Sequence, residues 1–378
     1  MSKYARYLFF VPIFFMLFLM LFILNVYLYD PAQIFHKPYF RKTTFHGDMR
    51  IMAKGIIDFY DFDSYILGTS MLENTFANEA NQKLGGKWVN ISMHGSSFYE
   101  RKIILDYIMT HKKAKRIVYT VDNILDAQTP DVRLDTFSYN NTWLDDVLLY
   151  TYDKFILCSL SWSQSENCVG QHRVESIEDS IVKTIYDVQV LYGGIENWLY
   201  GFDIDNIEHR GRVNELKAVI NSKNLIVEPQ ASRIQQNIAD NVLSTIKQYH
   251  ETQFYLIIPT YSRLAYKIPY RTNQYDDVLL WLVAEIDKLP NAILYGFDDL
   301  DYADHIENYR DLTHYNIDMN LMQLDAIRDE THTLTPHNIE EYLNTMRRKI
   351  DEYDPKPIIE TIKAALQKRG IDLERLQD

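Results

Sequence analysis

Cysteine is scarce in this chain of 378 residues, which has only Cys158 and Cys168, ten positions apart. Such a pair is compatible with one local disulfide in an oxidising compartment, and equally with two buried free thiols. No Cys-x-x-Cys or His/Cys spacing typical of a zinc site is present. A Gly-x-Gly-x-x-Gly fingerprint is also missing, and Gly68-Thr69-Ser70 is too short for a P-loop. We therefore expect neither a metal nor a cofactor.

Positive charge is also in short supply, with 39 Lys and Arg against 52 Asp and Glu and a net charge of −13. The basic residues form no extended stripe. Because neutralising phosphates requires clustered Lys and Arg, the composition argues against a nucleic-acid partner. Hydrophobic residues make up 47% of the chain, which is enough for a sizeable core in one large domain or two ordinary ones.

Charged residues are absent from Tyr7 to Tyr29, and the segment from Leu8 to Leu28 is almost wholly Leu, Phe, Ile, Met and Val. At a rise of ~1.5 Å per residue it covers a hydrocarbon core of ~30 Å. No Ala-x-Ala cleavage site follows, which favours an uncleaved membrane anchor over a signal peptide. The basic residues flanking the segment are nearly balanced. The very short N-terminal tail favours a cytoplasmic N-terminus and an extracytoplasmic globular part.

Short apolar segments alternate with helix-like segments along the rest of the chain, which predicts a parallel α/β sheet covered on both faces. The strands are expected at 63–67, 88–92, 116–121, 254–258 and 292–295. Helices are expected at 71–84, from about 97, around 234–246, at 278–289 and at 317–327. Five such strands suit a doubly wound sheet, in which ligands gather beyond the carboxyl ends of the strands.

This pattern divides the chain into a cytoplasmic stub with the anchor (1–29), a juxtamembrane segment (30–60), an α/β domain (61–330) and a helical tail (331–378). A simple crossover needs only about a dozen residues. We therefore expect a mostly helical insertion at about 124–231, either a lid or wall over the site or a packing subdomain. In the tail, Thr335 and Pro336 predict an N-cap and a first helical position, and Pro355 and Pro357 predict a break.

Polar residues with chemical potential follow four of the expected strands. Ser70 follows the first strand, and a serine hydroxyl needs a base to become a nucleophile. Asp311 and His314 follow the fifth, and an Asp three residues before a His can orient its ring. After the second and third strands, Gly95 could offer a backbone N–H and Asn123 a side-chain amide to an oxyanion.

Each of these residues also has a structural interpretation. Ser70-Met71-Leu72-Glu73 fits a capping box, in which Ser70 caps the following helix. Asp311 could cap a helix that starts near Thr313. Gly95 could be a turn glycine and Asn123 a helix cap. Their shared position at one edge of the predicted sheet favours the functional interpretation.

The order of these blocks resembles that of the SGNH (GDSL-like) hydrolases, over about 60–125 and 232–330. The resemblance implies a three-layer α/β/α flavodoxin-like fold and a serine esterase or O-acyltransferase activity without a metal. It also implies that Ser70 is the nucleophile, His314 the base and Asp311 its orienting carboxylate. The oxyanion hole would be formed by the backbone N–H groups of Ser70 and Gly95 and by the Asn123 side chain.

Two blocks depart from the usual pattern of the family. Thr69 stands where Asp is usual, and Val121-Asp122-Asn123 lacks the usual glycine before its Asn, so Asp122 is an alternative occupant of the third position. The anchored layout is similar to an extracytoplasmic branch that acylates polysaccharides and teichoic acids beside membrane-bound O-acyltransferases. The resemblance implies an enzyme that adds or removes an acyl group, acetyl in the first instance, on a cell-surface glycan. The alternative is a non-catalytic scaffold partner of such an acyltransferase.

Overall fold

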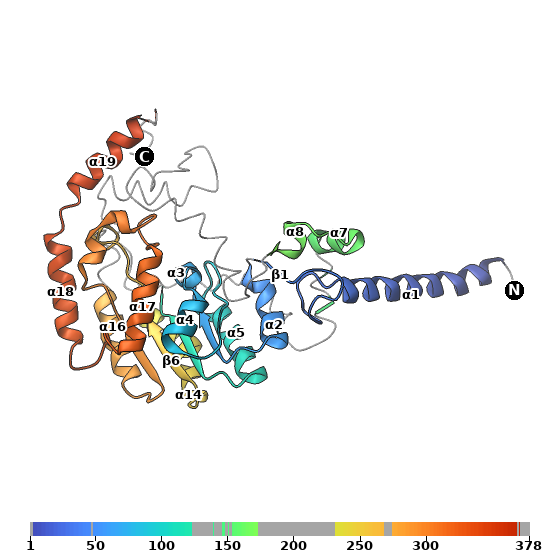
Figure 1. Ribbon diagram of the computed structural model, residues 1–378, viewed down its shortest axis with the longest axis horizontal. Helices are drawn as coiled ribbons and strands as arrows, with labels where there is room; N and C mark the ends of the chain where they lie inside the picture. Colours follow the sequence, from blue (N-terminus) through green and yellow to red (C-terminus); the bar gives the residue numbers. More distant parts are fainter. Residues whose placement is uncertain are drawn as a thin grey trace.

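The computed structural model describes residues 3–46, 48–122, 153–172, 231–267, 274–368 and the isolated positions 139, 146, 147, 150 and 370. Asn123 and most of the expected insertion at 124–231 lie outside the described residues, and the described part of the insertion contains two helices, at Asp153–Ser161 and Glu166–Val169. The architecture of the described part is shown in Figure 1.

A five-stranded, all-parallel sheet forms the centre of the molecule, in the order β3-β2-β4-β6-β7. This arrangement confirms the predicted α/β fold, and it is the strand order of flavodoxin-like sheets. The strands are β2 (Ser64–Leu67), β3 (Trp88–Asn90), β4 (Arg116–Thr120), β6 (Gln253–Ile257) and β7 (Ala292–Tyr295).

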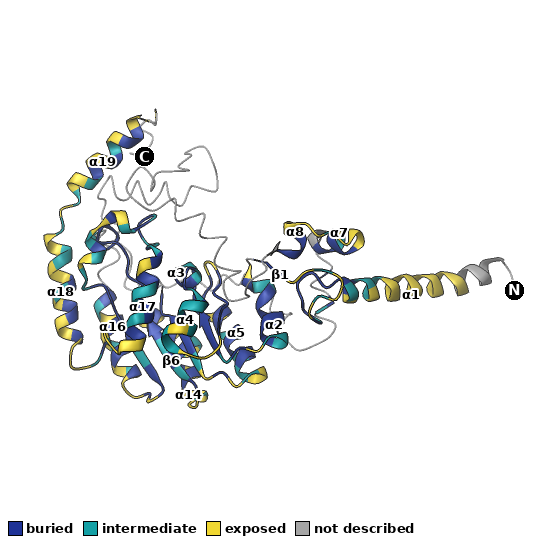
Figure 2. Ribbon diagram, viewed as in Figure 1, coloured by how far each residue is buried: buried dark blue, intermediate teal, exposed yellow. Residues whose placement is uncertain are grey.

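Helices cover both faces of the sheet. On one face α5 (Phe98–His111) packs against the helix after the insertion, which in turn packs against α16 (Tyr275–Ile286). On the other face α4 (Ala77–Leu84) packs against α17 (Ile317–Asp329). The sheet and the inner helix faces are buried in Figure 2, and β2 and β3 are buried at every position. This burial explains why the strands are continuous apolar runs.

The expected single helix at 71–84 is wrong, because the chain forms α3 (Ser70–Glu73) and then α4. The break has a local cause in Asn90 at the end of β3. Its side-chain amide donates to the carbonyls of Leu72 at 2.7 Å and of Thr75 at 2.9 Å. These carbonyls are thereby satisfied without a continuous helix.

The helix that precedes β6 contains a π-helical segment. It consists of α13 (Ala231–Ile238), the π segment Ala239–Leu243 and α14 (Ser244–Gln248). The buried residues Ile234, Ile238, Val242 and Ile246 recur every four positions. That spacing exceeds 3.6 residues per turn, so a locally wider turn keeps all four on one face.

The tail forms α18 (Ile339–Glu352) and α19 (Lys356–Lys368), separated by the predicted break at Pro355. Asn338 rather than Thr335 precedes α18, so the predicted cap is wrong. The Asn338 side chain accepts from the Thr335 N–H at 2.8 Å and donates to the Thr333 carbonyl at 2.7 Å. These bonds close a turn before the helix begins.

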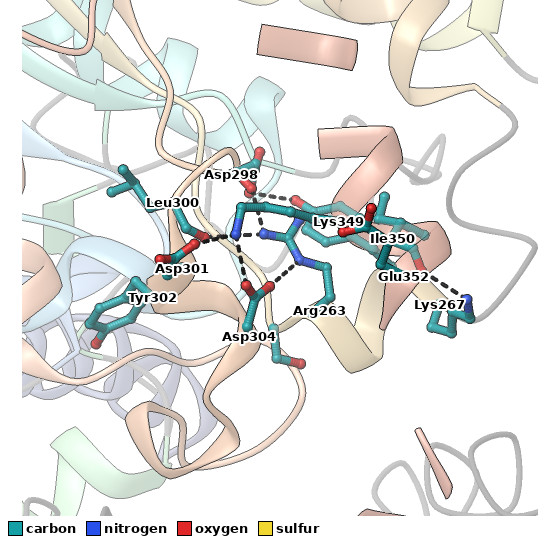
Figure 3. A network of polar contacts seen from close by, with 12 residues as sticks. Arg263, Lys267, Asp298, Leu300, Asp301, Tyr302, Asp304, Lys349, Ile350 and Glu352 are labelled. Carbon is teal, nitrogen blue, oxygen red and sulfur yellow. Dashed lines mark hydrogen bonds and ion pairs between the residues drawn. The ribbon is translucent and has the colours of Figure 1, made fainter. Parts of the chain in front are cut away.

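A polar network ties the tail to the loops after β6 and β7 (Figure 3). The fully buried Arg263 starts α15 (Arg263–Lys267) and pairs with Asp304 at 2.6 Å. It also donates to the Asp298 carbonyl at 2.8 Å. Lys349 of α18 pairs with the other Asp304 oxygen at 2.8 Å. One carboxylate therefore joins two cations from separate parts of the chain.

The N-terminal helix α1 (Lys3–Tyr29) projects away from the sheet, and most of its length is exposed (Figures 1 and 2). Its segment Phe9–Tyr29 contains an 18-residue stretch with a mean hydropathy of 2.7, and the segment is long and apolar enough to cross a membrane. At its C-terminal end lie α7 (Asp153–Ser161) and α8 (Glu166–Val169). A disulfide joins Cys158 of α7 to Cys168 of α8.

Candidate active site

Ser70 is the first residue of α3 and directly follows the turn at the carboxyl end of β2. The predicted capping box is wrong, because Thr69 is the N-cap and its hydroxyl accepts from the Met71 N–H at 3.4 Å. The Ser70 hydroxyl is therefore not used for capping. It lies partly exposed, 2.8 Å from Nε2 of His314.

His314 and Asp311 complete a hydrogen-bonded row that begins at Ser70. His314 Nδ1 lies 2.7 Å from Asp311 Oδ2. The other Asp311 oxygen accepts from the backbone N–H groups of His314 at 2.8 Å and Thr313 at 2.9 Å. The carboxylate therefore holds both the imidazole and its own loop. The structure brings together the three residues that the sequence nominated, across 244 positions of chain.

The loop that carries Asp311 and His314 is braced at its base. Tyr309 and Tyr315 form an antiparallel bridge, and the Leu312 carbonyl accepts from both the N–H and the hydroxyl of Ser262 at 3.0 and 2.8 Å. The expected helix starting near Thr313 is wrong, because α17 begins at Ile317 with Asn316 as its cap. Asp311 therefore caps its own turn rather than a helix.

A second brace connects this loop and α17 to the turn that carries the serine. The Met71 carbonyl, one residue after Ser70, accepts from the Tyr315 hydroxyl and from the Asn320 side-chain amide, both at 2.9 Å. Tyr315 and Asn320 are both buried. Two bonds on one carbonyl fix the backbone of the serine turn relative to the histidine loop.

The electrostatics of the row favour an ionised Asp311. Burial alone would raise the pKa of its carboxyl group, but the charge of His314 and the hydrogen bonds from His314 and Thr313 outweigh it. The pKa of Asp311 is therefore held well below its usual range. An ionised carboxylate accepts a hydrogen bond from Nδ1–H and leaves Nε2 as the nitrogen that can take the serine proton.

Gly95 lies in an exposed turn after β3 and has a positive φ of 58°, a conformation that favours glycine. Its turn is held beside the serine turn because the Gly68 carbonyl accepts from the Met93 N–H at 2.8 Å and from the Ser96 hydroxyl at 3.4 Å. The third predicted oxyanion residue, Asn123, lies outside the described residues. Two of the three predicted donors, Ser70 and Gly95, are thus on turns joined through Gly68.

Asp122, the alternative to Asn123 as the third oxyanion residue, makes other contacts. It is buried and pairs with the buried Arg101 of α5 at 2.5 Å. It also accepts from the hydroxyls of Thr69 and, at 3.2 Å, Thr120. An oxyanion next to this carboxylate would be repelled rather than stabilised. Asp122 is therefore a positioning residue, which holds the Thr69 cap under Ser70.

Arg101 was not among the residues predicted from the sequence, although its position in the helix carries a signal. It occupies the same helix stripe as Ile104, Leu105 and Ile108, which are all buried. A charged residue on an apolar stripe requires a buried partner, because an unpaired buried charge is very costly. Asp122 follows β4, the strand after α5, and it was the acidic residue in position to pair with Arg101.

No group of three or more His, Cys, Asp or Glu residues in the described ranges has the geometry to hold a metal ion. Comparisons of the chain with family models, with curated proteins and with solved structures gave no match. The site is therefore defined by its own geometry, as a serine–histidine–aspartate row at the carboxyl edge of a parallel sheet.

Proposed function

We propose that this chain is a membrane-tethered serine esterase or O-acyltransferase that removes or adds an acyl group, acetyl in the first instance, on a cell-surface glycan. The observation that carries the proposal is the continuous row from Ser70 Oγ through His314 to Asp311, with contacts of 2.8 and 2.7 Å. Both distances lie within the hydrogen-bond reach required of a nucleophile and its base.

The proposed chemistry has two halves. Ser70 Oγ attacks the ester carbonyl carbon while its proton passes to His314 Nε2, and the tetrahedral oxyanion faces the backbone N–H groups near Ser70 and Gly95. The alcohol leaves with the proton from His314, and an acyl-serine remains. Water or a sugar hydroxyl then gives its proton to His314 and attacks the acyl carbon, the bond from that carbon to Ser70 Oγ breaks, and His314 returns the proton to Ser70 Oγ. Water yields hydrolysis, and the sugar hydroxyl yields transfer.

Location supports a substrate outside the cytoplasm. The α1 helix provides one apolar segment long enough to span a membrane. The Cys158–Cys168 disulfide is typical of oxidising compartments. Both features agree with an extracytoplasmic catalytic domain, and the glycan substrate follows from the resemblance to anchored SGNH-type proteins. The same features suit the alternative, in which this chain is a scaffold beside a membrane-bound O-acyltransferase. Such a scaffold would have no reactive serine.

A fluorophosphonate probe separates the enzyme from the scaffold, because it reacts covalently with activated serines. We expect the full chain in detergent to be labelled at Ser70, as read by mass spectrometry of the modified peptide. Ser70→Ala should abolish labelling, and His314→Gln should slow it strongly. Ser244→Ala, at an exposed serine whose hydroxyl donates to the Asp240 carbonyl one turn earlier, is the matched control and should label normally.

The substrate class needs a second measurement. Release of acetate from an O-acetylated polysaccharide, or its transfer to an unacetylated one, should require Ser70 in the full chain. A folded wild-type protein that neither reacts with the probe nor moves acetyl groups would contradict the enzymatic proposal and favour the scaffold.

A further inference from the structure

The C-terminal end of α1 is partly covered by protein, although it belongs to the apolar segment. Every residue from Phe9 to Leu21 is exposed, whereas Val26 and Tyr29 are buried. The helix α7 packs against this end. The apolar segment thus has an exposed N-terminal part, called the bare part below, and a C-terminal part against which α7 packs, as Figure 2 shows.

The bare part is too short to cross a bilayer. Counted from Tyr7, directly after the charged Arg6, to Leu21, it rises about 22 Å. A hydrocarbon core is about 30 Å thick. A spanning helix must therefore place its next turn and a half, from about Phe22 onwards, inside the membrane. Asn25 of this stretch contacts Ser159 of α7, which places α7 at the depth of the outer membrane interface.

The side chains of α7 fit that depth. Its inner face buries Phe155, Cys158 and Ser159, while Leu157 and Leu160 on the outer face are 69% and 63% exposed. Neighbouring leucines that are exposed on the outer face of a helix form an apolar surface patch, which is typical of a contact with lipid or with protein. No other described element covers the outer face of α7 (Figure 2).

Aromatic residues surround α7 at the same level. Trp162, directly after the helix, is 37% exposed, and its ring lies 5.8 Å from Tyr29 and 5.9 Å from Phe40. Phe40 and its neighbour Tyr39 are 67% and 62% exposed. Trp and Tyr are enriched where membrane proteins meet the headgroup region. The exposed Lys42 follows these rings in the sequence and would face lipid phosphates, whereas Nζ of Lys37 lies over the Tyr60 ring.

The attachment of α7 to α1 is specific. Asn25, the one amide in the apolar segment, donates to the Ser159 carbonyl at 2.8 Å and accepts from the Trp162 indole at 2.6 Å. The Tyr29 hydroxyl donates to the Ser163 carbonyl. These bonds satisfy polar groups that would be costly in lipid, and the disulfide joins α7 to α8.

We propose that α7, Trp162 and the Tyr39–Phe40 loop form a second membrane contact, which lies in the outer interface of a phospholipid bilayer and holds the catalytic domain at a fixed orientation to it. The occupant of this apolar face is lipid, because the face continues the surface of the spanning helix. The inference rests on the membrane anchoring in the proposed function, and not on the catalytic chemistry.

Tryptophan fluorescence in lipid vesicles tests the depth of Trp162. The full chain is reconstituted in phosphatidylcholine and phosphatidylglycerol, and the Trp162 signal is isolated as the difference between wild type and Trp162→Phe. We expect bromine atoms high on the acyl chains to quench this signal more strongly than bromine atoms near the chain ends, and aqueous acrylamide to quench it weakly. Quenching by acrylamide with none by brominated lipid would overturn the inference, and would leave a protein partner as the occupant.

Substitutions on the outer face of α7 provide a second test of the membrane contact. Leu157→Glu combined with Leu160→Glu should lose the bromolipid quenching of Trp162, whereas Leu280→Glu, at an exposed leucine of α16, should retain it. Unchanged quenching in the double variant would count against the inference. Resistance to carbonate extraction reports the spanning helix, and an extractable chain would overturn the inference together with the anchoring. Fluorophosphonate labelling of Ser70 reports the catalytic proposal separately.

Discussion

Asp311→Asn tests the catalytic row most directly, because the amide matches the carboxylate in shape but reverses one hydrogen bond. Oδ1 would still accept from the His314 and Thr313 N–H groups, which lie at 2.8 and 2.9 Å. The amide NH2 would then face Nδ1 of His314. A rotated amide is disfavoured, because its NH2 would face those two backbone donors. The loop should therefore keep its shape.

The reversed bond selects the wrong tautomer of His314. Nδ1 must accept from the new amide, so the ring proton moves to Nε2, which then points at Ser70 and cannot take the serine proton. The equivalent substitution in serine proteases lowers kcat about 10⁴-fold. That factor corresponds to about 5 kcal/mol of transition-state stabilisation. We expect a fall of the same order here, in kcat rather than in KM, because the carboxylate does not touch substrate.

Hydrolysis of p-nitrophenyl acetate gives kcat and KM separately, and urea unfolding monitors the fold. Asp329→Asn is the matched control, because Asp329 pairs with Arg328 at the exposed end of α17 and should affect neither measurement. If the folded Asp311→Asn protein keeps a kcat within about tenfold of wild type, the tautomer argument is refuted.

Two further predictions concern buried charges. Arg101→Met leaves Asp122 buried without its cation and should lower the free energy of unfolding by about 3–5 kcal/mol, whereas adding Asp122→Leu should recover much of the loss. Urea unfolding of the single and double variants measures both effects, and equal stability of the three proteins would contradict them. For Asp298, burial raises the pKa to about 6 despite hydrogen bonds from three tyrosines. A raised pKa gives stability that is full well below the unfolded pKa of about 3.9 and is lost as pH rises through 6, so wild type should lose about 2 kcal/mol relative to Asp298→Asn between pH 4 and 7. A constant difference would contradict the assignment.

The strands could be located from sequence because the sheet is buried on both faces. The fourth strand, expected at 254–258, is found at Gln253–Ile257, and the fifth is found where it was expected, at Ala292–Tyr295. The helix ends were less predictable, because side chains distant in sequence decide them. Asn90 interrupts the helix after Ser70 by binding carbonyls from a neighbouring strand, and no local pattern near Ser70 records that contact.

The residues of the candidate site could be nominated from sequence because each chemical group has a strict requirement. A base needs an orienting acceptor, and the spacing from Asp311 to His314 supplies one within a single turn. The contacts that brace the site could not be predicted from the sequence. The contacts of Tyr315 and Asn320 with the Met71 carbonyl depend on how α17 packs against α4, which is a property of the folded chain.

The geometry of the row also bears on the choice between enzyme and scaffold. One hydrogen bond contributes only about 1 kcal/mol, too little to align segments 244 positions apart, so the alignment comes from the braces around Met71 and Leu312. A scaffold would need those braces, but it would gain nothing from a buried carboxylate aimed at a half-exposed imidazole. Removing a carboxylate from water costs free energy. Asp311 stays buried and ionised behind His314 despite that cost. A carboxylate in this position orients a catalytic histidine, so its presence favours the enzyme over the scaffold.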